Sequence, residues 1–281
     1  YLFQPDNCAL HRYNGRQAAA CLRNKRLILI GDSMAWSQFE SLACMLGPGA
    51  IAVNGTRMMS AEHFMQWQDS RYRGDLLLAG NASVHMRGIN KFDDGERWRK
   101  WLRDLGGLSS SDILIVNWGS HYTLHGSFED YKQGMQRIIL EELRQLPCQI
   151  YWREYSPTHF GGPSGKFTHD PSVKVCAPAE TGETEYNDWI QRLLAQCGAA
   201  CAHIKLLPIW GASLGRYGSH AGDHIPEKKF GFWVKAVRHD CRHFCLNVVD
   251  VWNQILLNMI CSPAAMQAPI LRNSHNPSIA H

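Results

Sequence analysis

One segment near the N-terminus constrains the fold more than any other part of the chain. Residues 26–30 form an apolar run typical of a buried strand, and the run stops at Gly31-Asp32-Ser33. Beyond Ser33, Ala and large apolar side chains recur at the spacing of one helix face as far as Gly47-Pro48. The segment therefore predicts a strand, a tight turn and a helix, with Ser33 in the turn.

Further strands and helices alternate along the chain. A second buried strand is expected at 112–117, followed by a loop and a helical stretch that ends near residue 143. Two more strands are expected at 149–152 and 203–207, with a helix at 184–196 between them. Such alternation predicts an α/β fold with a central parallel sheet covered by helices on both faces.

The composition fits one large globular domain. Of the 281 residues, 45% are hydrophobic and 19% are charged, and no repeat or linker divides the chain. We expect a single domain over 1–261, an irregular tail over 262–281, and a long Gly- and Pro-rich loop at 158–184 that borders a site. The formal charge of +4 is spread along the chain apart from a mild basic cluster within 12–26, so we expect no nucleic-acid partner.

The cysteines indicate an oxidising compartment. Ten cysteines are many for a cytosolic enzyme, and the sequons at Asn54 and Asn81 agree with a glycoprotein of the secretory pathway. No apolar run approaches the roughly 20 residues that span a bilayer. Because the chain starts abruptly at Tyr1, we expect its targeting or anchoring segment to lie upstream, so that a membrane is contacted only through that segment.

A zinc site is the first alternative use of the cysteines and histidines. His220 and His224 have helical spacing, and a Cys/His alternation follows at His239, Cys241, His243 and Cys245. The paired Cys-then-His spacing of structural zinc modules is missing, and cysteines of secreted proteins tend to oxidise. We therefore expect no metal.

Ser33 is well placed to act as a nucleophile. A helix N-terminus offers unpaired N–H groups and a positive dipole end where an oxyanion forms. The simpler interpretation is that Ser33 only caps its helix.

Near the other end of the chain, Asp240 and His243 supply a carboxylate and an imidazole three residues apart. His243 would take the proton of Ser33 while Asp240 orients the imidazole.

These segments resemble a known family. Gly31-Asp32-Ser33 and Asp240-x-x-His243 are similar to the first and fifth blocks of SGNH (GDSL-like) hydrolases. Residues 31–46 resemble the G-D-S-x-x-R-N-Q-x-E-S-L-x-C-M-L motif of the plant trichome-birefringence-like proteins of the PC-esterase family, and residues 240–256 resemble its D-C-x-H-W-C-L-P-G-x-x-D-x-W-N-x-L-L motif. The chain departs from these motifs at Trp36-Ser37 and at Asn247-Val248, which puts substrate contacts of the missing arginine in doubt.

The resemblance implies an SGNH-like three-layer α/β/α sandwich with long loops and a polysaccharide O-acetyltransferase of the Golgi lumen. Such an enzyme needs an acetyl donor as co-substrate, a polysaccharide or oligosaccharide acceptor and no bound cofactor. An acetyl group would pass through Ser33 to a glycan hydroxyl in two displacements. Two alternatives stay open: a carbohydrate acetylesterase of the same fold, and a wall-glycan binding protein without catalysis.

The resemblance also suggests oxyanion and substrate residues. The oxyanion donors would be the Ser33 backbone N–H, Asn117 at the end of a buried strand and, on chain order alone, Gly55. A loop-capping role for Asn117 is the alternative. The candidate substrate contacts lie in matched loops, where a solvated or surface-paired side chain is the competing interpretation; they are His121, Arg153 and His159.

Overall fold

The computed structural model describes residues 10–47, 50–55, 73–92, 95–167, 175–221 and 240–261. A seven-stranded sheet with the order β2-β3-β4-β1-β5-β6-β7 forms its centre. The strands are β1 (Arg26–Gly31), β2 (Ala50–Gly55), β3 (Arg73–Leu78), β4 (Ala82–Gly88), β5 (Ile113–Asn117), β6 (Gln149–Arg153) and β7 (Ile204–Leu207). Strands β4, β1, β5, β6 and β7 pair in parallel, whereas β3 runs antiparallel to both β2 and β4.

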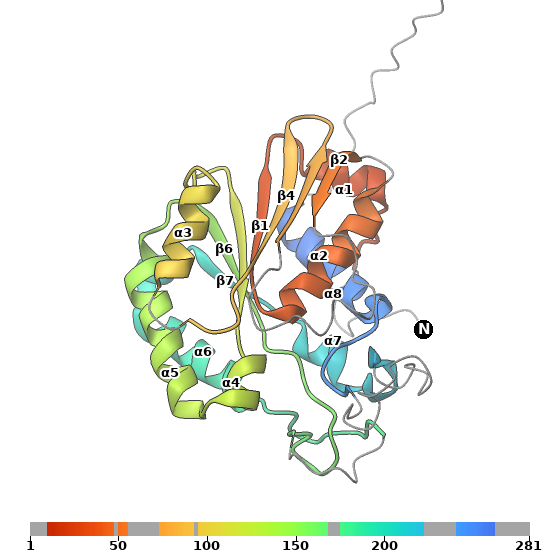
Figure 1. Ribbon diagram of the computed structural model, residues 1–281, viewed down its shortest axis with the longest axis vertical. Helices are drawn as coiled ribbons and strands as arrows, with labels where there is room; N and C mark the ends of the chain where they lie inside the picture. Colours follow the sequence, from red (N-terminus) through yellow and green to blue (C-terminus); the bar gives the residue numbers. More distant parts are fainter. Residues whose placement is uncertain are drawn as a thin grey trace, which may run out of the picture.

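Helices cover both faces of the sheet (Figure 1). One layer consists of α1 (Gly15–Cys21), α2 (Ser33–Leu46), α7 (Trp210–Leu214) and α8 (Leu246–Ile260). The other consists of α3 (Glu96–Asp104), α4 (Ser120–His125), α5 (Phe128–Arg137) and α6 (Glu185–Cys197). A π-helical turn (Ile138–Glu142) and a 3₁₀ turn (Leu143–Gln145) extend α5, and further 3₁₀ turns lie at Gly198–Cys201 and Tyr217–Ser219. The arrangement is the three-layer α/β/α sandwich that the sequence predicts.

The pleat of β1 divides the core into two parts. Leu27 and Leu29 pack in the cluster beneath α2 and α8, while Ile28 and Ile30 pack in the cluster beneath α3, α5 and α6. Successive side chains of a strand point to opposite faces, so a strand with helices on both sides is apolar throughout. This is why β1 and β5 read as continuous apolar runs.

The strands on one side of the sheet were not predicted. β2, β3 and β4 carry charged or polar residues at several positions and form antiparallel pairs at the sheet edge. The predicted loop over 158–184 contains no helix or strand in its described parts, 158–167 and 175–184. The predicted tail over 262–281 lies outside the described residues. Among the residues described, no helix has the length and apolarity that a membrane crossing requires.

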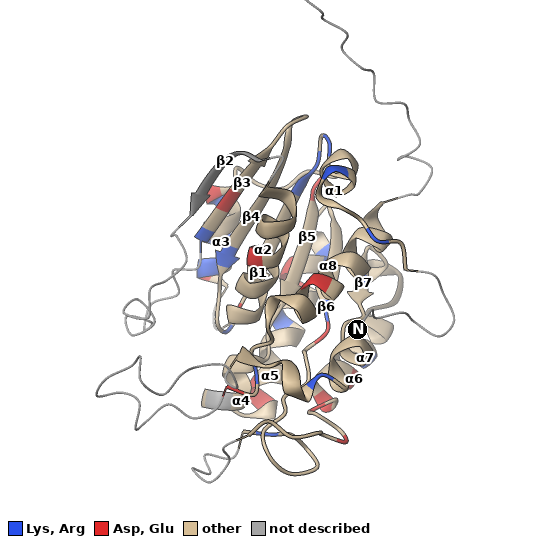
Figure 2. Ribbon diagram, turned by 90° about the vertical axis from the view of Figure 1, so that its right-hand side faces the viewer, with Lys and Arg blue, Asp and Glu red and all other residues tan. Residues whose placement is uncertain are grey.

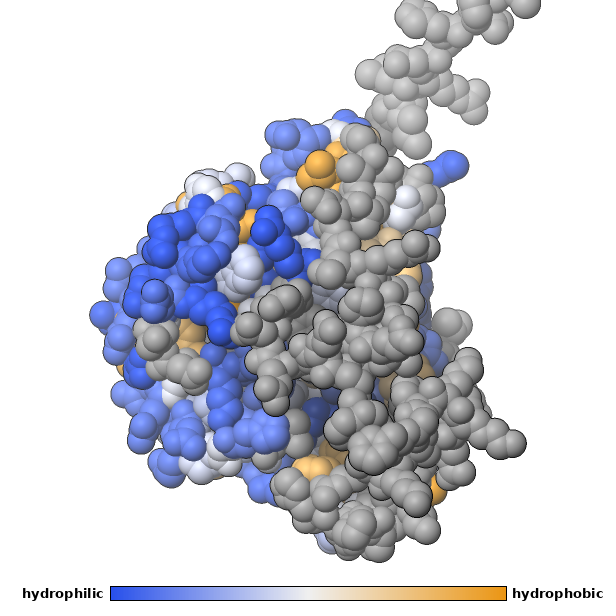
Figure 3. Space-filling model, in the orientation of Figure 1, coloured by the Kyte–Doolittle hydropathy of each residue, from blue (hydrophilic) through white to orange (hydrophobic). Residues whose placement is uncertain are grey.

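Both helices and strands carry charged residues of both signs. Figure 2 shows basic residues on α3 and beside β3, interspersed with acidic ones. The surface over α3 and α5 is predominantly hydrophilic (Figure 3). Arg26, from the basic cluster of the N-terminal segment, is not simply solvated, because its guanidinium pairs with Asp112 at 2.6 Å beside the start of β5.

Candidate active site

Ser33 lies in the turn between β1 and α2, as the first residue of that helix. The buried Asp32 caps the helix: its Oδ1 accepts the Met34 N–H at 3.0 Å, and its Oδ2 accepts the Ser120 N–H at 3.2 Å. Asp32 thereby joins the turn after β1 to the turn after β5. No described residue accepts a hydrogen bond from the Ser33 backbone N–H, which leaves this donor at the helix N-terminus unused.

Ser33, His243 and Asp240 form a continuous hydrogen-bonded chain. His243 Nδ1 donates to Asp240 Oδ2 at 2.7 Å, and the Ser33 hydroxyl donates to His243 Nε2 at 2.6 Å. Because a carboxylate only accepts, the neutral imidazole carries its proton on Nδ1 and presents a lone pair to Ser33. The arrangement can therefore remove a proton from Ser33.

The carboxylate of Asp240 is strongly held in its ionised form. Burial raises its pKa, but the charge of His243 and the hydrogen bonds from the His243 side chain and from the backbone N–H groups of Arg242 and His243 lower it by more. Burial lowers the pKa of His243, but the charge of Asp240 and the hydrogen bond to it raise it above its usual value. The Asp240 carboxylate therefore stabilises the positively charged imidazolium that His243 becomes when it accepts a proton.

The packing of α8 on α2 brings His243 to Ser33. Ser41 Oγ donates to Asp250 Oδ1 at 2.5 Å, and Asn253 Nδ2 donates to Ser41 Oγ at 2.7 Å. Trp252 Nε1 donates to Ser213 Oγ at 2.8 Å, which adds α7 to the contact. The polar residues of both sequence motifs thus fasten the two helices together. Since α2 begins at Ser33 and α8 begins three residues after His243, this contact sets the distance between them.

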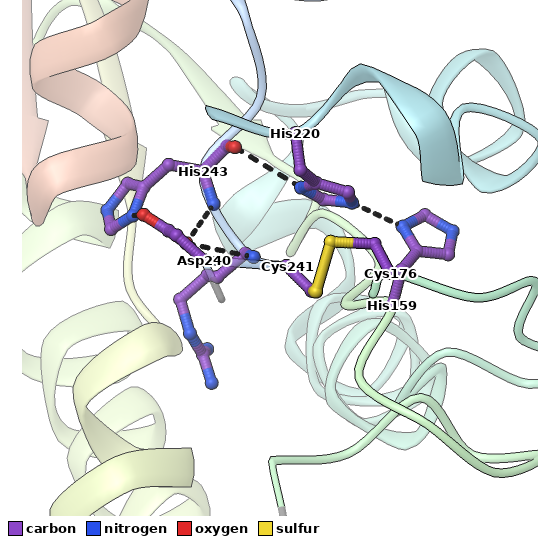
Figure 4. The surroundings of a disulfide bond; sticks show 7 residues. His159, Cys176, His220, Asp240, Cys241 and His243 are labelled. Atoms are coloured by element: carbon purple, nitrogen blue, oxygen red, sulfur yellow. Dashed lines mark hydrogen bonds and ion pairs between the residues drawn. A yellow bond between two sulfur atoms is a disulfide. The ribbon is translucent and has the colours of Figure 1, made fainter. Parts of the chain in front are cut away.

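The segment that carries Asp240 and His243 is also held from its other side (Figure 4). Cys241 forms a disulfide with Cys176, and its carbonyl accepts the His159 N–H at 2.9 Å. The His243 carbonyl accepts the Ala221 N–H at 2.8 Å and lies 3.2 Å from Nδ1 of His220. Two further disulfides, Cys21–Cys261 and Cys197–Cys201, lie elsewhere in the fold.

Asn117 lies beside the Ser33 turn, but its amide is already used. The strand register pairs Asn117 with Gly31, two residues before Ser33. Its Nδ2 donates to the carbonyl of Arg153 at 3.0 Å and to that of Glu154 at 3.3 Å. The amide group is therefore committed to the backbone at the end of β6, as in the loop-capping alternative. The structure leaves no free Asn117 donor for an oxyanion.

Gly55 does not lie near Ser33. It ends β2, and β3 and β4 stand between that strand and β1. Three strand spacings put it about 14 Å from the end of β1, beyond hydrogen-bond reach. The glycine beside Gly31 is Gly88, at the end of β4. Chain order misled the choice of glycine because β4 was not predicted.

Arg153 and His159 are buried and do not reach a surface where a sugar can bind. The Arg153 guanidinium donates to the Met34 carbonyl at 2.9 Å and to Gln38 Oε1 at 3.0 Å, and it also bonds Asn117 Oδ1. Burial lowers its pKa to about 10. His159 Nε2 donates to the Leu214 carbonyl at 2.8 Å, and its Nδ1 lies 2.6 Å from His220 Nε2. Both side chains brace the fold around the site, which corrects their assignment as substrate contacts.

His121 lies at the edge of the site. It is half-buried in α4, the helix that follows β5. Burial lowers the pKa of His121. The nearby Asp32 carboxylate raises this pKa, whereas the charges of Arg242 and His243 lower it further. Among the predicted substrate contacts, His121 alone keeps a partly open side chain near the three linked residues.

No group of three potential metal ligands occurs in the described part of the chain. His224 and His239 of the alternative zinc site lie outside that part.

The two sequon asparagines lie in different settings. Asn81 is exposed at the turn between β3 and β4, with a φ of 55°. Asn54 lies within β2.

A second Ser–His–Asp chain offers a comparison. Ser83 Oγ donates to His85 Nε2 at 3.0 Å, and His85 Nδ1 donates to Asp75 Oδ1 at 2.6 Å. Ser83, however, lies within β4, and its backbone N–H is used by the Lys25 carbonyl at 3.2 Å. It therefore has neither a helix N-terminus nor a free backbone donor. Of the two hydrogen-bonded Ser–His–Asp series, only the one at Ser33 also has an unused backbone N–H that can bind an oxyanion.

The sequence profile of the PC-Esterase family, a GDSL/SGNH-like acyl-esterase family found in Pmr5 and Cas1p, matches residues 10–130 and 119–259. The chain belongs to the PC-Esterase family. Among solved structures, this PC-Esterase chain matches the crystal structure of a DUF4886 family protein from Bacteroides uniformis. The TM-score is 0.46 at 13% sequence identity, with 90% of this chain and 88% of that chain covered.

Plant proteins similar to this PC-Esterase chain have O-acetyltransferase and trichome birefringence-like names. Xyloglucan O-acetyltransferase 2 of Populus trichocarpa is 25% identical, over 92% of this chain and 71% of the relative. Xyloglucan O-acetyltransferase 1 of Arabidopsis thaliana is 25% identical, over 92% and 69%. Protein trichome birefringence-like 42 of Arabidopsis thaliana is 24% identical, over 93% and 78%. The predicted family is confirmed, and the matches support an acyl-transferring enzyme.

Proposed function

We propose that this PC-Esterase chain is a polysaccharide O-acetyltransferase that moves an acetyl group through an acyl-enzyme on Ser33. The observation that carries the proposal is the chain from Ser33 through His243 to Asp240 at the N-terminus of α2. The names of the similar plant proteins support an acetyl group and a glycan acceptor.

In the first displacement, Ser33 Oγ attacks the carbonyl carbon of the acetyl donor. His243 Nε2 takes the hydroxyl proton, and the Asp240 carboxylate stabilises the imidazolium. The oxyanion that forms accepts the free Ser33 N–H and faces the positive end of the α2 dipole. When the tetrahedral intermediate collapses, the bond to the leaving group breaks, His243 returns its proton to that group, and Ser33 remains acetylated.

In the second displacement, a glycan hydroxyl attacks the acetyl carbon of the acyl-enzyme. The hydroxyl gives its proton to His243 Nε2, and the ester bond to Ser33 breaks. His243 then returns the proton to Ser33 Oγ, which restores the starting state. His121, half-buried beside the linked residues, is our candidate for a contact to the acceptor.

The three disulfides found within the described residues support an oxidising compartment for this chemistry. We extend the proposal to the lumen of the secretory pathway, in the Golgi, with wall polysaccharides as acceptors. Cys176–Cys241 is the most relevant pair, because Cys241 lies between Asp240 and His243 in the chain.

A carbohydrate acetylesterase is the second candidate, and the acyl-esterase description of the family favours it. Both functions use the same acyl-enzyme and differ in whether water or a sugar hydroxyl discharges it. Incubation with 4-nitrophenyl acetate and xyloglucan, xylan or pectic oligomers separates them, with oligomers whose hydroxyls are blocked as a matched control. A transferase adds acetyl groups to one of the oligomers whose hydroxyls are free. Acetate release at the same rate with open, blocked or no glycan contradicts transfer and identifies an esterase.

A further inference from the structure

Arg242 is a buried cation in the segment between Asp240, which orients the proposed base, and His243, the base itself. Its backbone N–H donates to Asp240 Oδ1 at 3.1 Å, and the residue is only 3% exposed. It occupies the variable position of the Asp-Cys-x-His motif. A buried guanidinium is costly unless its hydrogen bonds are met, so its partners indicate what it does.

Among the described residues, the side-chain hydrogen-bond partner of the Arg242 guanidinium is the hydroxyl of Tyr155, and the guanidinium also lies over the Phe160 ring. Arg242 Nη1 donates to Tyr155 Oη at 2.7 Å, and Tyr155 Oη donates to Glu183 Oε2 at 2.8 Å. Thr158 Oγ1 donates to the same carboxylate oxygen at 2.8 Å. One hydroxyl thus links a buried cation to a buried carboxylate. The three side chains form a relay, Arg242–Tyr155–Glu183, behind the proposed active site.

Tyr155 is fixed firmly enough to serve as an anchor. Its backbone N–H donates to Asn187 Oδ1 at 2.7 Å, and its carbonyl accepts Asn187 Nδ2 at 3.0 Å, which ties it to α6. Its ring packs directly on Gly119, where an added Cβ would lie 2.2 Å from a ring carbon. The ring thus touches the turn after β5, whose Ser120 N–H donates to Asp32 beside Ser33.

The other end of the relay is held in an unusual conformation. Glu183 has a φ of 70°, a left-handed value that costs free energy for a residue with a side chain. Such conformations persist where the surrounding contacts require them, and here the buried carboxylate is held by two hydroxyl donors. The fold therefore maintains this carboxylate in place at an energetic cost.

We propose that Arg242 is a positioning residue for the Asp240–His243 pair, anchored by Tyr155 and Glu183. The relay fixes the backbone from which Asp240 receives the Arg242 and His243 N–H groups, and so fixes the carboxylate that orients the imidazole. The proposal rests on the proposed function, in which His243 is the base.

The charge of Arg242 has a second effect that can be measured. Burial lowers the pKa of His243, and Arg242 lowers it further, whereas Asp240 and Asp32 raise it. His121 and His220 also approach His243, and each interacts with it electrostatically. Removing the Arg242 charge therefore raises the pKa of His243, and the base stays protonated to a higher pH.

The test compares Arg242→Met, which loses the charge, with Arg242→Lys, which keeps it, and with Tyr155→Phe, which loses only the hydroxyl. Tyr151→Phe is the matched control, because its buried hydroxyl contacts the Met259 carbonyl near the C-terminal end of α8 and is not part of the Arg242–Tyr155–Glu183 relay. Each full-length variant is measured for Tm, kcat and KM for 4-nitrophenyl acetate, and the pH profile of kcat/KM. Ser33→Ala is assayed alongside.

We expect Arg242→Met and Tyr155→Phe to lower kcat by on the order of 100-fold while KM is unchanged, since misplacement of a catalytic group affects the transition state. The acid limb of the profile moves to higher pH in Arg242→Met and stays in place in Arg242→Lys. The proposal is overturned if folded Arg242→Met and Tyr155→Phe keep the kcat of Tyr151→Phe, or if the limb does not move in Arg242→Met. Activity in Ser33→Ala would instead refute the proposed function.

Discussion

The hydroxyl of Ser33 and the Nε2 atom of His243 lie 2.6 Å apart, although 210 positions separate the two residues in the chain. Ser33 is placed by β1 and the cap of α2, and His243 by the disulfide at Cys241 and the packing of α8 on α2. Both ends of this contact are therefore set by parts of the fold that also hold the core together.

Replacing Asp240 by Asn should abolish most activity while the fold remains. The amide introduced by this substitution would donate to Nδ1 of His243, so the imidazole proton would move to Nε2 and the lone pair facing Ser33 would be lost. We expect kcat to fall by on the order of 10⁴-fold, as in serine proteases with this change. Asp75→Asn in the second Ser–His–Asp chain is the matched control and should retain activity. Near-normal turnover in Asp240→Asn would show that another residue orients His243.

The activity should depend on pH through His243. The imidazole must be neutral to accept the Ser33 proton, and Asp240 raises the pKa of His243 against the effect of burial. The acid limb of kcat/KM should therefore lie above about pH 6.5, the usual pKa of histidine. The protonated imidazole stabilises the fold below its unfolded pKa, and this contribution is lost as the pH rises through the folded pKa. An acid limb clearly below the usual histidine value would contradict the assignment.

The Cys176–Cys241 disulfide should matter for both stability and activity. It closes a loop with a sequence separation of 65, so removing both cysteines should lower the free energy of unfolding by about 4 kcal/mol. The matched control is the double alanine variant of Cys197–Cys201, whose separation of 4 predicts a loss of about 2 kcal/mol. Turnover should fall only in the first variant. Denaturation measures the stability of both double variants, and an activity assay measures their turnover. Equal losses of stability in the two variants, with turnover unchanged in the variant that lacks Cys176–Cys241, would argue against this role.

Arg153 should act on stability. Arg153→Met leaves the acceptors on Met34, Gln38 and Asn117 without their donor inside the core. We expect the free energy of unfolding to fall by at least about 2 kcal/mol. Arg144→Met, at an exposed position, should change it little. Urea denaturation measures both, and a neutral Arg153→Met would show that the guanidinium contributes nothing to the fold.

The central strands and the proposed triad were accessible from the sequence for physical reasons. β1 and β5 are buried on both faces and therefore appear as unbroken apolar runs. Ser33, Asp240 and His243 were located because their short-range motifs, Gly-Asp-Ser and Asp-x-x-His, place reactive groups at element boundaries. The hydrogen bonds between them are consistent with that interpretation, and their catalytic roles stay a prediction.

The direction of individual side chains was less accessible. Arg153 is the last residue of β6, and whether it faces the core or a sugar depends on Gln38 and Asn117, each more than 30 positions away. His159 is buried by residues far from it in the chain, among them His220 and Leu214, whose atoms lie within hydrogen-bond distance of its ring nitrogens. Gly55 is the glycine that chain order alone favours, and the polar Ser83 and His85 hide from the sequence the strand β4, whose Gly88 pairs with Gly31. Long-range partners decided each of these positions.

The central claim is that Ser33 is acetylated during turnover. The most direct measurement is mass spectrometry with peptide mapping after incubation with 4-nitrophenyl acetate and no acceptor, applied to the native chain, Ser33→Ala and Ser83→Ala. The account predicts one acetyl group on Ser33 in the native chain and in Ser83→Ala, none in Ser33→Ala, and discharge of the adduct to a glycan oligomer when one is added. An acetyl group found reproducibly at another residue, with Ser33→Ala fully active, would contradict it.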